Sequence, residues 1–292
     1  MSERVVVTLD GQVHDADTPL LYADDLAAVR GDGIFETILV RGGAPCTVEL
    51  HLERLQASAR ALDLPAPDPD EWRLVIGLAV DEWTRTSEDE GVLRLVLSRG
   101  RESGGEPTGY ATVGPLHERV AKARTEGVAA ITLERGYSVD FAAKAPWQLL
   151  GAKTLSYATN MAALRHAARQ GADDVIFTSS EGRVLEGPRS TVVIARGKTL
   201  ITPPADHGIL PGTTVDALFR VAADKGYTCE RSDVFPADLI AADGVWLISS
   251  ITLAARVVSL NGVVLGTPAV ADEVRSMVDV AVETIGDETS TG

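Results

Sequence analysis

Hydrophobic and polar residues follow two kinds of spacing along this chain, and each spacing predicts a different kind of element. Short runs rich in valine and isoleucine, bounded by turn residues, are typical of β-strands. Between Thr47 and Asp63 the apolar residues lie four and three positions apart, which indicates one face of a helix: Val48, Leu52, Leu55, Ala59 and Leu62. The same reasoning predicts strands at Arg4–Asp10, Ile34–Val40, Gly91–Ser98, Val128–Leu133, Asp174–Thr178, Thr191–Arg196 and Val245–Ser250, and helices at Glu71–Arg85, Leu155–Arg169, Gly212–Lys225 and Ala269–Ile285.

A change of pattern near residue 120 divides these elements into two groups. The charged segment His117–Glu126 is predicted as a linker, and after it strands alternate with helices. Before it, the stretch Arg99–Gly114 contains glycine, proline and serine and is predicted as a long loop, a kind of segment that is often functional. We therefore predict an α+β protein with a small domain over residues 1–120, which carries loop 99–114, and a larger domain over residues 121–292.

Composition and charge narrow the class of protein. The 292 residues are 45% hydrophobic and 24% charged, which is typical of globular proteins. The chain has 27 basic and 42 acidic residues, and a net charge of -15 argues against binding to nucleic acid or to an anionic membrane. An acidic protein can still contain a basic pocket, so a small anionic substrate is compatible with this charge.

Cysteine content and hydropathy indicate the compartment. Cys46 and Cys229 stand far apart with no Cys/His cluster around them, so neither a disulfide framework nor a metal site is predicted. The N-terminal sequence lacks a signal-peptide pattern, and no apolar run reaches the roughly 18 residues that span a membrane. The sequence therefore predicts a cytoplasmic protein.

Lys153 is the first candidate for chemistry, because the chain has only five lysines in which to place an amine nucleophile. It stands between an apolar stretch and a predicted helix, where partial loss of solvent lowers a lysine pKa and favours Schiff-base formation. The alternative is a solvated lysine in the first helical turn. Lys144 has a weaker context for the same chemistry.

Glu186 is the second candidate. It stands between Val184-Leu185 and the turn Gly187-Pro188, where a carboxylate could pair with a buried cationic heteroatom. An ordinary turn glutamate is the alternative.

Two hydroxyl-rich segments are candidates for phosphate binding. Thr213 and Thr214 open a predicted helix, where backbone N–H groups and hydroxyls suit a phosphate, although ordinary N-capping explains them as well. The segment 249–252 (Ser-Ser-Ile-Thr) follows a buried strand, and Arg54 lies off the apolar helix face as an anion ligand or a solvated charge. One amine, one acid, two hydroxyl clusters and an arginine are the set that pyridoxal phosphate requires.

On these residues the chain resembles the class IV aminotransferases, the fold-type IV pyridoxal-phosphate enzymes. Within that family it is most similar to the 4-amino-4-deoxychorismate lyases. The matching segments occur in family order between about residue 5 and residue 265: 30–37 (RGDGIFET), 51–55 (HLERL), 151–153 (GAK), 185–187 (LEG), 209–214 (ILPGTT) and 249–250 (SS).

The resemblance implies a role for each matching residue. Lys153 would form the Schiff base with pyridoxal 5'-phosphate, and Glu186 would pair with the pyridinium nitrogen. The phosphate would be held by Arg54, Thr213, Thr214 and Ser250. The family resemblance also implies a two-domain fold like that of D-amino-acid aminotransferases, and a homodimer with the active site near the interface.

The reaction is expected from the same resemblance. The segments 98–100 (SRG), 104–105 (GG) and 109–110 (GY) are similar to a pattern of aminodeoxychorismate lyases, although short insertions interrupt them. The lyase converts aminodeoxychorismate to p-aminobenzoate and pyruvate in folate biosynthesis. Arg99 and Phe35 would contact the substrate, with a solvated loop charge as the alternative for Arg99.

Three alternatives remain open at this point. A D-amino-acid aminotransferase carries a comparable Thr-Arg-Gly, and a branched-chain aminotransferase shares the cofactor residues. The third is a cofactor-binding protein without catalysis. The segment 156–160 (SYATN) departs from both the lyase and the branched-chain pattern, which leaves Tyr157 and Asn160, like Arg101, without an assigned role.

Overall fold

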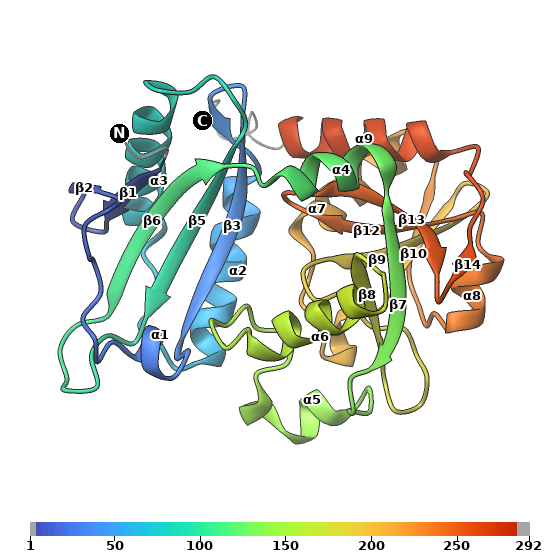
Figure 1. Ribbon diagram of the computed structural model, residues 1–292, viewed down its shortest axis with the longest axis horizontal. Coiled ribbons are helices and arrows are strands. Elements are labelled where there is room, and N and C mark those ends of the chain that lie inside the picture. Colours follow the sequence, from blue (N-terminus) through green and yellow to red (C-terminus); the bar gives the residue numbers. More distant parts are fainter. Residues whose placement is uncertain (1–3, 285–292) are drawn as a thin grey trace. The chain divides into compact units, whose positions relative to one another are not determined.

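The computed structural model describes residues 4–284, and residues 1–3 and 285–292 lie outside the described part. The chain forms two compact units (Figure 1). The N-terminal unit contains the residues up to His117 together with Ala152–Tyr157. The second unit contains Glu118–Gly151 and the described residues from Ala158 onward. Lys153 thus belongs to the N-terminal unit, although the sequence alone places it after the domain boundary.

The N-terminal unit is built on a six-stranded sheet in which the neighbouring strands are antiparallel. Its strand order is β2-β1-β6-β5-β3-β4. Buried apolar side chains such as Ile34, Ile38, Leu93 and Leu95 form its core. The strands are β1 (Val5–Thr8), β2 (Val13–Asp15), β3 (Gly33–Arg41), β4 (Ala44–Pro45), β5 (Gly91–Ser98) and β6 (Thr108–Pro115).

Two long helices cover this sheet, and both lie behind it in Figure 1. Helix α2 (Val48–Ala61) packs against β3, and α3 (Pro69–Thr84) packs against β1, β5 and β6. Asp68 caps α3 by accepting a hydrogen bond from the Asp70 N–H, and proline occupies the first helical position. A short helix, α1 (Leu26–Val29), precedes β3.

The predicted loop 99–114 is wrong over its second half. Residues from Thr108 onward form β6, which pairs with β5 along its whole length, so that the true connection is short. Gly109, which resembles a loop residue, serves strand packing instead: a Cβ on it would lie 2.2 Å from a methyl carbon of Leu9. Tertiary packing here overrides the turn signal of the local sequence.

The second unit is built on an eight-stranded mixed sheet of order β11-β10-β9-β12-β13-β7-β8, with β14 paired to β13. The pairs β10–β11, β13–β7 and β7–β8 are parallel. Its strands are β7 (Val128–Glu134), β8 (Asp174–Thr178), β9 (Thr191–Arg196), β10 (Thr199–Thr202), β11 (Thr228–Arg231), β12 (Gly244–Ser249), β13 (Leu253–Leu260) and β14 (Val263–Val264).

Helices pack on this sheet at several points. Helix α7 (Thr213–Asp224) packs on β12 and on α9 (Ala271–Thr284), and α6 (Ala158–Arg169) packs on β7 and β8. The predicted end of the last helix, Ile285, lies outside the described residues. The remaining helices are α4 (Glu118–Glu126), α5 (Phe141–Lys144), α8 (Pro236–Ala241) and the 3-10 turns η1 (Pro146–Gln148) and η2 (Ala205–His207).

The predicted helix Leu155–Arg169 begins three residues later, at Ala158. Lys153 therefore does not lie in a first helical turn, and that alternative is wrong. The segment around it is extended, and Thr154 forms a β-bridge with Ile34 of β3. Over residues 4–284, none of the helices has the length and apolar character needed to cross a bilayer.

Candidate active site

The main chain of Lys153 is fixed on both sides by the N-terminal unit. Its N–H donates to Oγ of Ser58 on α2 (3.1 Å), and its carbonyl accepts from the Phe35 N–H on β3 (3.1 Å). Two residues later, the Leu155 N–H donates to the Gly33 carbonyl (2.8 Å). These long-range bonds keep the segment extended, because a helix would need the same N–H and carbonyl groups for itself.

The amine of Lys153 lies over an aromatic ring. Its Nζ is 4.5 Å from the ring centroid of Phe35, a cation–π distance. The other aromatic contact of Phe35 is with Tyr157, whose ring meets it edge to face at 5.6 Å between centroids. The structure thus brings together the predicted catalytic lysine, the predicted substrate contact Phe35, and Tyr157.

Arg54 is held by a buried carboxylate that sequence reasoning did not single out. Its Nε and Nη2 donate to the two oxygens of Glu36 (2.8 and 2.7 Å), and Nδ1 of His51 lies 2.7 Å from Oε2 of Glu36. The Glu36 and His51 side chains are fully buried. A charged residue inside an otherwise apolar strand is the one sequence signal that could have identified Glu36.

Burial and charge act in opposite directions on the pKa of Glu36. Burial raises this pKa, but the Arg54 charge and the hydrogen bonds from Arg54 and His51 outweigh burial and hold it well below its ordinary value. For His51, burial is the largest effect and lowers the pKa. The hydrogen bond and the charge of Glu36 raise it, the charges of Arg54 and Lys153 lower it, and the pKa remains below its ordinary value. Glu36 is therefore an ionised anchor for Arg54, and His51 is neutral.

Glu186 in the second unit also has a cationic partner. Its Oε1 accepts from Nη1 of Arg135 (2.7 Å), and its Oε2 accepts from the Leu210 N–H (3.2 Å). Arg135 directly follows β7, and the parallel pairing of β7 with β8 brings it to Glu186, 51 positions away in sequence. Nothing in the local sequence around Arg135 predicts this pair.

The turn after Glu186 is fixed by Asn160. The Nδ2 of this side chain, on α6, donates to the Pro188 carbonyl (2.8 Å). Asn160, whose role the sequence left open, therefore holds the turn Gly187-Pro188 in place beside Glu186.

The N-terminus of α7 carries a buried hydroxyl without a partner. Thr213 and Thr214 are buried, and Oγ1 of Thr214 makes no hydrogen bond within the described residues. Gly212 permits a close approach, because a Cβ there would lie 2.3 Å from Oγ1 of Thr191. Since buried hydroxyls are nearly always bonded, an unpaired one at a helix N-terminus fits an anionic group such as a phosphate.

Ser250 lies at the same end of the sheet in the second unit. Strand β12 ends at Ser249, and the preceding Ile248 pairs with Thr191 of β9, which lies against Gly212. The Ser249 hydroxyl bonds to Oγ1 of Thr252 (2.6 Å) and closes the turn that contains Ser250. Another buried hydroxyl without a described partner, that of Ser190, belongs to this region.

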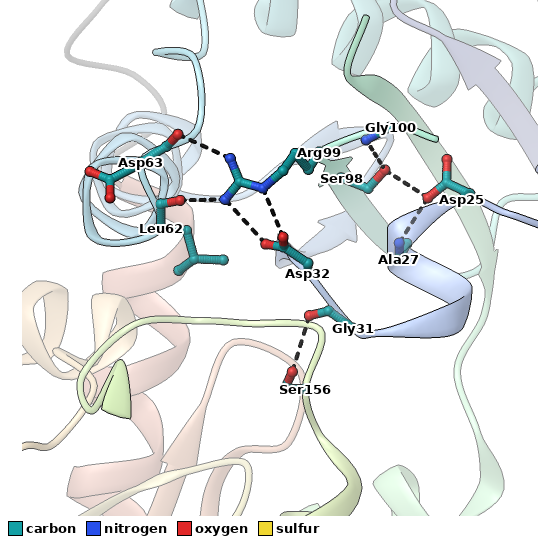
Figure 2. Close-up of polar contacts among 10 residues, drawn as sticks. All are labelled: Asp25, Ala27, Gly31, Asp32, Leu62, Asp63, Ser98, Arg99, Gly100 and Ser156. Carbon is teal, nitrogen blue, oxygen red and sulfur yellow. Dashed lines mark hydrogen bonds and ion pairs between the residues drawn. The ribbon is translucent and has the colours of Figure 1, made fainter. Parts of the chain in front are cut away.

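Two arginines that follow β5, Arg99 and Arg101, are bound within the N-terminal unit. Arg99 pairs with Asp32, with 2.7 Å between Nε and Oδ2 (Figure 2). Arg101 pairs with Asp24 (2.8 Å) and lies 4.1 Å from the ring centroid of Tyr22. Hydrogen bonds from Arg101 and Ser103 lower the pKa of Asp24 to about 2.

Apart from Arg99, the predicted site residues and the partners that the structure adds form two groups, each inside one unit. The Lys153 group consists of Lys153, Phe35, Glu36, His51 and Arg54. The Glu186 group consists of Glu186, Arg135, Ser190, Thr213, Thr214 and Ser250. Among residues 4–284, no three His, Cys, Asp or Glu side chains gather as a metal site. The Lys153 group supplies an amine, and the Glu186 group supplies an acid with a cationic partner and a phosphate cradle. Each group provides part of the set that pyridoxal phosphate requires.

A family model described as amino-transferase class IV matches residues 33–260. The chain belongs to this family. It is 54% identical over 285 residues to the bifunctional aminodeoxychorismate lyase / D-amino acid transaminase of Mycobacterium tuberculosis (strain ATCC 25618 / H37Rv), which covers 95% of this chain and 99% of that protein.

Solved structures of class IV aminotransferases also resemble this chain closely. A hypothetical aminotransferase from Mycobacterium tuberculosis, in its α-ketoglutarate and PMP bound form, matches with a TM-score of 0.95 and 55% identity. Its PLP-bound form matches with the same TM-score and identity, and in each case 96% of this chain and 99% of the other chain are covered. The predicted family, fold class and enzyme class are confirmed, and the predicted cofactor is the ligand named for that PLP-bound relative.

Proposed function

We propose that this class IV enzyme is an aminodeoxychorismate lyase, which converts 4-amino-4-deoxychorismate to p-aminobenzoate and pyruvate in folate biosynthesis. The observation that carries the proposal is the 54% identity to a relative named for this activity, over 95% of this chain. The geometry supports it, since both groups of site residues that a pyridoxal-phosphate enzyme requires are present, and their members are buried or half-buried.

Lys153 and Phe35 would act at the reacting atoms. Bound pyridoxal phosphate supplies an electron sink. Lys153 would hold the cofactor through its amine and then move a proton at the ring carbon that bears the substrate amino group. Phe35 would pack against the reacting groups, as it packs against Lys153 Nζ in the structure.

The other residues would bind the ends of the cofactor. Glu186 would hold a proton at the pyridine nitrogen, with its carboxylate oriented by Arg135 and the Leu210 N–H. Arg54, Thr213, Thr214 and Ser250 would bind the phosphate. The unpaired buried hydroxyl of Thr214 is the strongest support for this assignment.

D-Amino-acid transamination is the second candidate function. The same 54% identical relative is named for both activities, which favours D-amino acids over branched-chain amino acids among the alternatives. In this reaction Lys153 would move the proton at the Cα of the amino acid instead.

A coupled assay tests both functions on protein loaded with pyridoxal phosphate. Aminodeoxychorismate is generated from chorismate and glutamine by a synthase, and p-aminobenzoate and pyruvate are both measured. We expect equal amounts of the two products, and loss of both in Lys153→Ala; Lys144→Ala is the matched control and should retain activity. Release of neither product, with amino transfer from a D-amino acid, would replace the lyase by the second candidate.

A homodimer, a small anionic substrate and a cytoplasmic location are also part of the proposal. The free cysteines Cys46 and Cys229 agree with a reducing compartment. Analytical ultracentrifugation of the loaded enzyme would test the dimer, because a dimer should sediment with twice the mass of one chain.

A further inference from the structure

The guanidinium of Arg99 forms four hydrogen bonds inside the N-terminal unit (Figure 2). Nε and Nη2 donate to the two carboxylate oxygens of Asp32 (2.7 and 3.3 Å). Nη2 also donates to the Leu62 carbonyl (2.6 Å), and Nη1 donates to the Asp63 carbonyl (3.2 Å). We call these four residues the Arg99 clamp. Four of the five guanidinium N–H groups are therefore engaged, which leaves too few for bidentate binding of a substrate carboxylate.

The Arg99 clamp joins two elements that are distant in sequence. Asp32 lies in the turn before β3, whereas Leu62 and Asp63 follow the last turn of α2. Carbonyl groups at a helix C-terminus carry partial negative charge, so a guanidinium there both caps the helix and stabilises its dipole. The Arg99 N–H adds a main-chain bond to the Asp32 carbonyl (3.2 Å).

The same two elements hold the main chain of Lys153. Ser58, on α2, accepts the Lys153 N–H, and Phe35, on β3, donates to the Lys153 carbonyl. The turn before β3 makes a third contact with this segment, because Oγ of Ser156 donates to the Gly31 carbonyl (3.1 Å; Figure 2). A change in the spacing of α2 and β3 would therefore move Lys153.

We propose that Arg99 is a positioning residue for Lys153, and that the Arg99 clamp fixes α2 against β3 so that the amine is held in place. This inference rests on the proposed role of Lys153 as the cofactor-binding amine. It assigns Arg99 a role different from the substrate contact that the family resemblance implies.

The experiment compares Arg99→Ala, Asp32→Ala and the double variant, each loaded with pyridoxal phosphate. The readouts are the rate of cofactor release and the pH dependence of the visible absorbance of lysine-bound cofactor. We expect each single variant to release cofactor roughly tenfold faster, because displacement of a supporting residue commonly has effects of this size. The double variant should be no worse than Arg99→Ala, since that substitution already removes every side-chain bond of the Arg99 clamp.

Two further variants separate positioning from general destabilisation. Arg73→Ala is the matched control, because Arg73 also forms a bidentate pair with α2, at Glu49, and is similarly exposed. It should leave cofactor release unchanged. Arg99→Lys keeps the charge, but a lysine cannot bond to Asp32 and to the α2 carbonyls at once. It should therefore retain cofactor better than Arg99→Ala does. It also remains informative if Arg99→Ala fails to fold.

The outcomes are distinguishable. If Arg99→Ala raises only the KM for substrate, while cofactor release and the absorbance profile match the wild type, Arg99 is a substrate contact and the proposal is overturned. Borohydride reduction and peptide mapping of the wild type test the foundation separately. Cofactor attached at a residue other than Lys153 would overturn the proposed function, and this inference with it.

Discussion

Glu36 and Thr214 are buried polar residues of the two site groups, yet they differ in what they bond to. Glu36, in the Lys153 group, receives hydrogen bonds from Arg54 and His51. Thr214, in the Glu186 group, has a hydroxyl with no partner in the described structure. The polar atoms of Glu36 are thus satisfied by the fold itself, whereas the Thr214 hydroxyl is one that a bound anionic ligand would satisfy.

The largest effect is expected from removing the charge of Glu36. In Glu36→Gln the buried guanidinium of Arg54 no longer faces a carboxylate, and breaking a buried ion pair in this way costs about 3–5 kcal/mol of stability. Urea unfolding of the cofactor-free protein measures this loss. Glu49→Gln, on the same helix, removes a partner of the exposed Arg73 and should cost less than about 1 kcal/mol. Equal losses in the two variants would show that Glu36 is not a special anchor.

Arg135 tests whether the Glu186 group also contains a structural pair. Arg135→Met removes a hydrogen bond to a carboxylate that is 13% exposed, and we expect a loss of about 2 kcal/mol in urea unfolding. Arg183→Met is the control, because its pair with Asp233 is more exposed and should contribute less than about 1 kcal/mol. No loss in Arg135→Met would mean that the pair of Arg135 with Glu186 does not stabilise the cofactor-free protein.

The pH dependence of stability should reveal the buried His51. Because burial lowers its pKa in the folded protein, the unfolded chain takes up a proton first as the pH falls below 6.5. The free energy of unfolding should then fall by at most about 1.4 kcal/mol per pH unit. Glu36 has a depressed pKa, so its contribution persists below pH 6.5 and is lost only as the pH falls below 4.5.

His51→Asn isolates the histidine contribution to this profile. Urea unfolding at a series of pH values on both sides of 6.5 should show a flatter profile for the variant in that range. Identical slopes for variant and wild type would contradict a neutral, buried His51.

The smallest expected effect is a change in the free energy of unfolding that has opposite signs at two buried threonines, Thr214 and Thr202. Thr214→Val removes an unpaired hydroxyl and should stabilise the cofactor-free protein by up to about 1 kcal/mol, while weakening cofactor binding about tenfold. Thr202→Val is the matched control in the same unit: its hydroxyl donates to the Val192 carbonyl (2.7 Å), so the same substitution should destabilise by about 1 kcal/mol. Losses of equal size at both positions, measured by urea unfolding, would mean that the Thr214 hydroxyl is bonded within the protein.

Local sequence was sufficient where an element is stabilised by its own pattern. The strands Gly91–Ser98, Asp174–Thr178 and Thr191–Arg196 were predicted with the bounds that the structure shows. Local sequence was insufficient to predict strand β6 and the extended segment around Lys153. In both cases the main-chain groups bond to residues far away in sequence, and local propensity contains no information about such partners.

The sequence by itself determined the family, because six short segments match the class IV aminotransferases in the family order. It also predicted Lys153, Glu186, Thr213 and Thr214 as the residues that carry the chemistry. The tertiary structure decided their partners. Arg54 meets Glu36 across 18 positions, Glu186 meets Arg135 across 51, and Arg99 meets Asp32 across 67. An ion pair depends on distance in space, which strand pairing and helix packing set, and not on distance along the chain.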